Sequence, residues 1–143
     1  MTLVVVDASV VVKWFIPEVL DQEAQRLRGS EYTCIAPAHW RTEVLNALWK
    51  KLAVRHEIEA PEYEATVGFA LATRMRSVPV DELLPDASRI ATTYGRTIYD
   101  SLYVALALRE RCPFVTADLK LFNALAPELS TTIRWLGALP ADQ

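Results

Sequence analysis

Short apolar runs rich in β-branched residues alternate along the chain with longer segments of helical periodicity. A continuous β-branched run at 3–7 predicts a strand that is buried on both faces. Further strands are predicted at 32–36, 114–116 and 132–135. The stretch Val78-Pro79-Val80 predicts a short edge strand, because proline cannot donate a hydrogen bond to a central ladder.

Between these strands, apolar residues recur with the period of a helix, and Gly, Pro and capping residues mark the ends. Helices are predicted at 10–15 with Ser9 as the cap, and at 19–27, 38–52, 61–75, 86–94, 99–111 and 119–125. Strands that alternate with helices or helix pairs are typical of a mostly parallel sheet covered on both faces. The prediction is one three-layer α/β domain spanning residues 1–143, with a central, mostly parallel β-sheet flanked by helices.

Four acidic residues occupy positions from which a fold of this kind can bring carboxylates together. Asp7 closes the first strand and Asp118 follows the strand 114–116, so both are expected at the carboxyl edge of the sheet, where open α/β sheets bind ligands. Glu43 lies at the edge of the apolar stripe of helix 38–52, and Asp100 lies in the first turn of its helix on the apolar face. The pattern predicts a divalent-metal site made of oxygen ligands.

Each acid taken alone also suits a purely structural role. Asp7 can be a turn residue, Asp118 an N-cap, Asp100 part of a capping box that begins at Thr97, and Glu43 a solvated helix residue. Taken together, carboxylates among apolar residues need a positive partner, because an unpaired buried charge costs several kcal/mol or takes up a proton. No Lys or Arg stands at an obvious pairing distance along the chain, although Lys13 or Arg41 can fold back, so a hard cation is the simpler compensation.

The charge balance is weak evidence against a nucleic-acid substrate. The formal net charge is −3, but 18 acidic residues less the four candidates leaves 14 against 15 Lys and Arg. Six basic residues can either supply phosphate contacts around the crevice or be ordinary solvated charges: Arg41, Lys50, Lys51, Arg55, Arg96 and Lys120. The apolar fraction of 52% leaves some surplus apolar surface, which suggests a protein interface.

Several other chemistries lack their motifs. There is no glycine-rich phosphate loop and no G-x-S-x-G, and neither His39 nor His56 has a partner at zinc spacing. Cys34 and Cys112 are expected to be reduced core residues, which favours a cytoplasmic protein. The first residues do not form an export signal, and no apolar run is long enough for a membrane span.

Four segments resemble motifs of the PIN-domain ribonucleases, and within them the VapC-type toxins of toxin–antitoxin pairs. The segments are Val5-Val6-Asp7-Ala8-Ser9, Glu43-Val44-Leu45-Asn46-Ala47, Tyr99-Asp100-Ser101-Leu102-Tyr103-Val104-Ala105-Leu106-Ala107 and Val115-Thr116-Ala117-Asp118. The resemblance covers nearly the whole chain. It implies a PIN-like fold with Mg²⁺ or Mn²⁺ held by Asp7, Glu43, Asp100 and Asp118, and support from Ser9 and Thr116. Some relatives carry an acid where this chain has Asn123, so occupancy by a second metal stays open.

The resemblance further implies a homodimer that cleaves RNA and is silenced by a cognate antitoxin protein. The expected function is that of a divalent-metal-dependent endoribonuclease, the toxin of a type II pair, with the four acids as catalytic residues. Three alternatives stay open: a PIN-domain RNA-processing nuclease outside such a pair, a non-catalytic protein-binding α/β module, and a phosphohydrolase with Asp7 as nucleophile. The last lacks the D-x-D-x-T motif, because Ser9 stands where the second Asp is needed.

Overall fold

A computed structural model describes residues 1–140 and contains a five-stranded, entirely parallel sheet. The strands are β1 (Thr2–Val6), β2 (Tyr32–Pro37), β3 (Arg76–Val78), β4 (Phe114–Thr116) and β5 (Ile133–Trp135). Their order across the sheet is β3-β2-β1-β4-β5. The chain therefore adds β2 and β3 on one side of β1, and then crosses over to add β4 and β5 on the other side.

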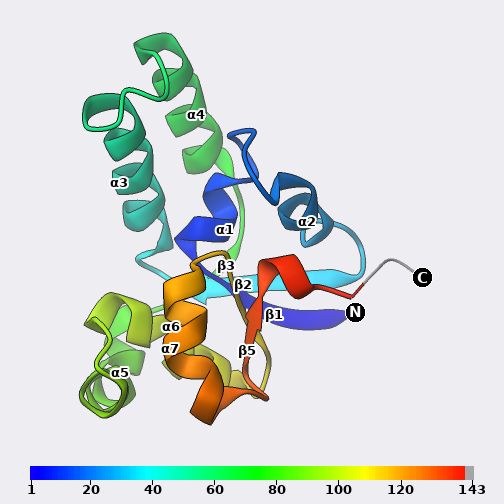
Figure 1. Cartoon of the computed structure of the whole chain (residues 1–143), viewed down its shortest axis with the longest axis vertical. Coiled ribbons are helices and arrows are strands. Elements are labelled where there is room, and N and C mark those ends of the chain that lie inside the picture. The colour runs from blue at the N-terminus through cyan, green and yellow to red at the C-terminus, as the bar shows by residue number, and fades with distance from the viewer. Residues whose placement is uncertain (141–143) are drawn as a thin grey trace.

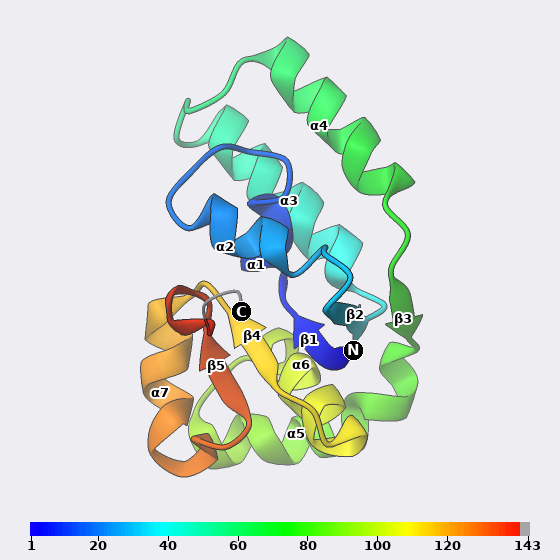
Figure 2. The same ribbon diagram turned by 90° about the vertical axis from the view of Figure 1, so that its right-hand side faces the viewer.

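Helices connect the strands, as parallel pairing requires. They are α1 (Ala8–Val12), α2 (Asp21–Arg26), α3 (Trp40–Ala53), α4 (Ala60–Ala72), α5 (Val80–Tyr94), α6 (Ile98–Glu110) and α7 (Leu119–Leu129), with a short 3₁₀ helix, η1 (Leu136–Ala138), after β5. In Figure 1, α3 and α4 stand as a pair that projects away from the strands. Figure 2 shows α1 to α4 above the sheet and α5 and α6 below it, so the strands form the middle of three layers.

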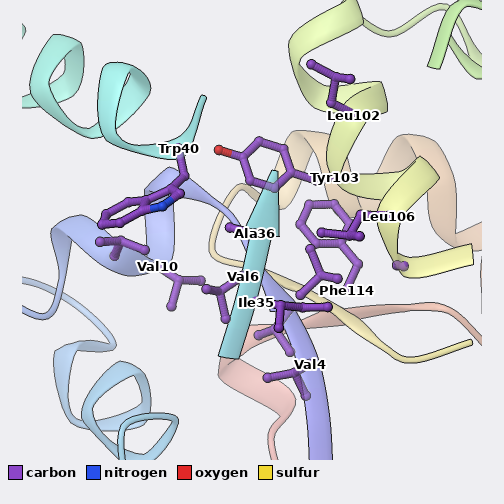
Figure 3. Close-up of a cluster of buried hydrophobic side chains, with 14 of the residues drawn as sticks. Val4, Val6, Val10, Ile35, Ala36, Trp40, Leu102, Tyr103, Leu106 and Phe114 are labelled. Carbon is purple, nitrogen blue, oxygen red and sulfur yellow. The ribbon is translucent and has the colours of Figure 1, made fainter. Parts of the chain in front are cut away.

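The core lies on both faces of the central strands. Val4, Val5 and Val6 of β1 are buried, as a strand covered on both faces requires. Figure 3 shows side chains from α6 on one side of these strands and Val10 of α1 on the other. The rings of Tyr103 and Phe114 stack with centroids 5.7 Å apart.

The structure confirms the predicted fold class and corrects several boundaries. The edge strand near residue 78 is real, but it ends at Val78, and Pro79 is the N-cap of α5. That helix begins at Val80 rather than at 86. The hydrogen bond lost at Pro85 is outweighed by the acidic first turn and by burial of the helix's apolar face. The helix predicted at 61–75 ends at Ala72.

The first helix also differs from its prediction. Its N-cap is Asp7 rather than Ser9, because the Asp7 carboxylate accepts a hydrogen bond from the backbone N–H of Val10. The helix ends at Val12, and turns carry the chain on from there to Ile16. Within residues 1–140, no helix is both long enough and apolar enough to cross a membrane.

Candidate active site

The carboxyl ends of β1 and β4 lie side by side at the point where the strand order reverses. Val6 of β1 is in register with Val115 of β4, so Asp7 and Thr116 stand opposite each other one residue further along their strands. In open α/β sheets such a switch point opens a crevice at the strand ends. The strand register therefore places Asp7 at the mouth of the site.

Asp7 is buried and held by several donors. Ser9 Oγ donates to Asp7 Oδ1 at 2.5 Å, Thr116 Oγ1 donates to Oδ2 at 2.6 Å, and the N–H of Val10 lies 3.3 Å from Oδ1. Ser9 Oγ in turn accepts from the N–H of Ala117 at 3.0 Å. The two hydroxyl residues that the resemblance implied as support thus contact Asp7 directly and tie β1 to the segment after β4.

Asp118 is the N-cap of α7 and Asp100 lies in the first turn of α6, so part of the capping interpretation holds. Asp118 Oδ1 accepts from the N–H of Leu121 at 3.1 Å and caps α7. The Asp100 N–H donates to Thr97 Oγ1 at 3.1 Å, and Arg96 Nη2 lies 4.0 Å from Asp100 Oδ2. Because Asp100 has this cation beside it, the expectation that no Lys or Arg stands near the acids was wrong for Asp100. The i, i+4 spacing of the two residues was the available signal.

Glu43 has two partners that the sequence patterns did not reveal. Tyr103 donates its hydroxyl to Glu43 Oε1 at 2.7 Å, and His39 Nε2 lies 3.1 Å from the same oxygen. In Figure 3 the Tyr103 hydroxyl is directed toward the start of α3. The histidine ring also packs 4.9 Å from the Tyr103 ring. His39 precedes Glu43 by one helical turn, which was a usable signal, whereas the contact with Tyr103 joins residues 60 positions apart.

All four predicted acids line one cleft of about 280 Å³. Ser9, Asn46, Lys50, Lys51, Arg55 and Tyr103 also line it. As the side chains stand, no three His, Cys, Asp or Glu residues within 1–140 form a group tight enough to hold a metal ion. Asn123 is exposed on α7 and does not line the cleft. A larger cavity of about 660 Å³, lined by the turn after α1 and by parts of α4 and β2 among others, has no carboxylate in its lining.

The acids influence one another's protonation. Burial raises the pKa of Asp7 from 3.8 to about 6, although its hydrogen bonds oppose the shift, and the Asp100 charge adds to it. The pKa of Asp100 is also raised, first by burial and then by the charges of Glu43 and Asp118. Burial disfavours ionisation of Glu43, but the close contact with His39 and the hydrogen bond donated by Tyr103 prevail, and the pKa of Glu43 is lowered. Glu43 is therefore held ionised, whereas Asp7 and Asp100 resist ionisation.

Neither of the two basic residues that could have folded back onto the acids does so. Lys13 Nζ lies 3.1 Å from Glu18 Oε1, and Arg41 donates to the carbonyl of Thr73 at 2.8 Å. Among residues 1–140, Arg96 is the Lys or Arg that forms an ion pair with one of the four acids, Asp100. The cluster thus keeps an excess of negative charge.

Comparisons with known proteins agree on one family. The model of the PIN domain family matches residues 4–126. Ribonuclease VapC3 of Pyrobaculum aerophilum is 34% identical over 122 residues, which cover 82% of this chain and 90% of the relative.

Two solved structures share the fold. Mycobacterium tuberculosis VapC20, described as a sarcin-ricin loop cleaving toxin, superposes with a TM-score of 0.62 at 17% identity, covering 85% of this chain and 94% of the other. A toxin–antitoxin complex from Klebsiella pneumoniae contains a chain with a TM-score of 0.54 at 12% identity, covering 83% and 89%. With a matching family model over most of its length and a curated relative above 30% identity, this chain belongs to the PIN domain family.

Proposed function

We propose that the protein is a divalent-metal-dependent endoribonuclease and the toxin of a toxin–antitoxin pair. The observation that carries the proposal is the meeting of Asp7, Glu43, Asp100 and Asp118 in one cleft at the sheet's switch point. Similarity to a VapC ribonuclease supports the same activity. The catalytic residues we assign are these four acids.

The chemistry of the cleft suits Mg²⁺ or Mn²⁺. Every candidate ligand is a carboxylate oxygen, which these hard cations prefer. The raised pKa values of Asp7 and Asp100 show two carboxylates whose charges are poorly compensated, and a cation beside them would relieve that cost. As the side chains of residues 1–140 stand, the acids form no group tight enough for a metal ion, so binding of a cation would require the carboxylates to move closer together.

Each supporting residue has a defined role in this proposal. Ser9 and Thr116 hold Asp7 in one orientation. Oδ1 accepts from both Ser9 and Val10, whereas Oδ2 accepts from Thr116 and keeps a second lone pair for a ligand. Tyr103 and His39 both engage Oε1 of Glu43, so Oε2 is the oxygen available to a ligand. Both Glu43 contacts favour the ionised carboxylate, which is the form that can bind a cation.

When bound, the cation would polarise the phosphodiester, neutralise charge that develops on it and help to deprotonate an attacking water. The protein's own task is to hold the acids ionised and oriented, and to align the RNA for in-line attack. Asp7, Asp100 and Asp118 would hold the cation directly, and Glu43 would complete the site or reach a second cation through water. No histidine base is needed, because His39 acts on Glu43.

The toxin assignment rests on relatives and on surface character. VapC20 is described as a toxin, and the Klebsiella structure as a toxin–antitoxin complex. Large apolar side chains are exposed on this chain, among them Phe69 and Leu71 of α4 and Trp49 of α3. Such surface suits a cognate antitoxin or a second copy of the chain in a homodimer acting in the cytoplasm.

Incubation of the purified protein with end-labelled total RNA tests the nuclease activity. Discrete cleavage is expected with Mg²⁺ or Mn²⁺, and none with EDTA or with Asp100→Asn. Asp86→Asn, at an acid outside the cleft, is the matched control and should cleave normally. Equal activity of Asp100→Asn and wild type would contradict the assigned role. Metal-independent stability with no cleavage would instead favour the non-catalytic binding module.

The toxin role is tested separately in cells. Induced expression of the wild-type chain in a bacterial host should arrest growth, and co-expression of the product of an adjacent small reading frame should restore it. Asp100→Asn should leave growth unaffected. A nuclease that is active in vitro but does not slow growth would indicate an RNA-processing enzyme outside a toxin–antitoxin pair.

A further inference from the structure

The candidate cleft carries opposite charges at its two ends. One wall is a single face of α3, along which Glu43, Asn46, Ala47 and Lys50 follow one another at helical spacing. Lys50 stands seven positions after Glu43, which is roughly 10 Å along a helix axis. The charge of Asp100 interacts with those of Asp7, Glu43 and Asp118, so the acids gather near Glu43 in the first turn of α3. Lys50 and Lys51 lie in the last turn of α3 and Arg55 follows it, and all three line the same cleft.

The structure distinguishes among the six basic residues that the sequence offered for phosphate contacts. Lys51 is buried, and its Nζ lies 2.7 Å from Glu18 Oε2 and 3.1 Å from Glu57 Oε2, so its charge is neutralised. Arg41 lies over the Trp40 ring and outside the cleft lining.

Arg96 faces Asp100, and Lys120 does not line the cleft. Lys50 and Arg55 differ from these four. Both line the cleft and both are exposed. Within residues 1–140, neither side chain has an ion pair or a hydrogen bond.

We propose that Lys50 and Arg55 form a phosphate-binding subsite that positions the RNA strand across the acidic end of the cleft. This inference rests on the proposed ribonuclease function and adds the residues that hold the substrate. Phosphates along one strand are spaced by a few ångströms, so a separation of roughly 10 Å corresponds to nucleotides close to the one that is cut. The two side chains act as positioning residues, because they lie away from the reacting group.

Electrostatics explains why the cleft needs this basic end. A phosphate approaching the four acids alone would be repelled. Positive side chains at the far end provide attraction that does not depend on a bound cation, and they steer the strand into the cleft. The carboxyl end of α3 also favours these charges, because the helix dipole places partial negative charge there.

The test is binding of a fluorescent single-stranded RNA, followed by anisotropy in EDTA over a series of KCl concentrations. Each phosphate contact contributes about 0.7 to the slope of log K against log salt for a single strand. The double variant Lys50→Gln/Arg55→Gln should therefore lower the slope by about 1.4 and weaken binding at least about tenfold at low salt. The charge-preserving double Lys50→Arg/Arg55→Lys should keep the slope.

The matched control is Arg74→Gln/Lys120→Gln, which removes two exposed charges outside this cleft. An equal loss in this control would overturn the proposal, because net charge alone would then account for binding. An unchanged slope in the Lys50/Arg55 double, or no binding by wild type in EDTA at low salt, would also overturn it.

In cleavage assays, the same double should raise KM and leave kcat within about twofold. A lower kcat at unchanged KM would overturn the positioning role. If the proposed ribonuclease function itself is wrong, the wild-type protein will cleave no RNA with any divalent metal. That result is distinct from an effect confined to the double variant.

Discussion

Replacing Asp7 by Asn should stabilise the metal-free protein at neutral pH. The pKa of Asp7 in the folded protein is about 6, against 3.8 for an unperturbed carboxyl. The unfolded chain therefore releases this proton more readily, and stability falls as the pH rises from 3.8 to 6. Because the side chain is buried, the full shift applies. It corresponds to a cost of ~3 kcal/mol at about pH 7.5 and ~0.5 kcal/mol at about pH 4.

The amide avoids this cost but loses one favourable contact. Its oxygen can still accept from Ser9 and Val10, whereas its NH₂ group faces Thr116, whose hydroxyl now donates to Asp7 Oδ2. Thr116 Oγ1 already accepts from the N–H of Asp118. This mismatch costs ~1 kcal/mol. The variant should therefore be ~2 kcal/mol more stable than wild type at about pH 7.5, and slightly less stable at about pH 4.

Urea unfolding followed by circular dichroism in EDTA measures both differences. Asp81→Asn, at an exposed carboxyl outside the cleft, is the matched control and should show a much smaller dependence on pH. If the difference between Asp7→Asn and wild type does not change sign or size between the two pH values, burial of an ionised Asp7 is not a cost, and the electrostatic argument fails.

Three further predictions concern the metal, the Glu43 contact and the core. Mg²⁺ or Mn²⁺ at about 100 times its Kd should raise the free energy of unfolding by ~2.7 kcal/mol. Differential scanning calorimetry should show a much smaller rise for Asp100→Asn, and an equal rise would contradict its role as a ligand. Tyr103→Phe removes the hydroxyl that lies 2.7 Å from Glu43, so the pKa of Glu43 should rise, and an NMR titration of its side-chain carboxyl carbon measures the change. An unchanged pKa would show that the contact does not hold Glu43 ionised. Trp40→Ala empties a fully buried position and should cost ~3–5 kcal/mol in urea unfolding; a loss below ~1 kcal/mol would show that the core repacks.

Local patterns along the chain were enough to predict the layers and most of the elements. Buried strands and amphipathic helices have different periods, and these periods are visible without any contact information. The positions of Asp7 and Asp118 after strands also predicted that they would meet, because parallel strands end at one edge of a sheet. Errors fell at boundaries, as at Val78 and Val80, where tertiary packing outweighed local preference.

Contacts between distant segments were decided by the folded structure alone. The hydrogen bond of Tyr103 to Glu43 and that of Thr116 to Asp7 join residues 60 and 109 positions apart, and no local pattern carries such distances. The same holds for the difference between Lys50 and Lys51, which are neighbours in the chain. Lys50 lines the cleft and is exposed and unpaired, whereas Lys51 is buried and pairs with Glu18 and Glu57. Hydrophobic periodicity and residue type determine which faces of a helix or strand are buried. Only tertiary packing determines which charged side chains are left unpaired and able to bind a substrate.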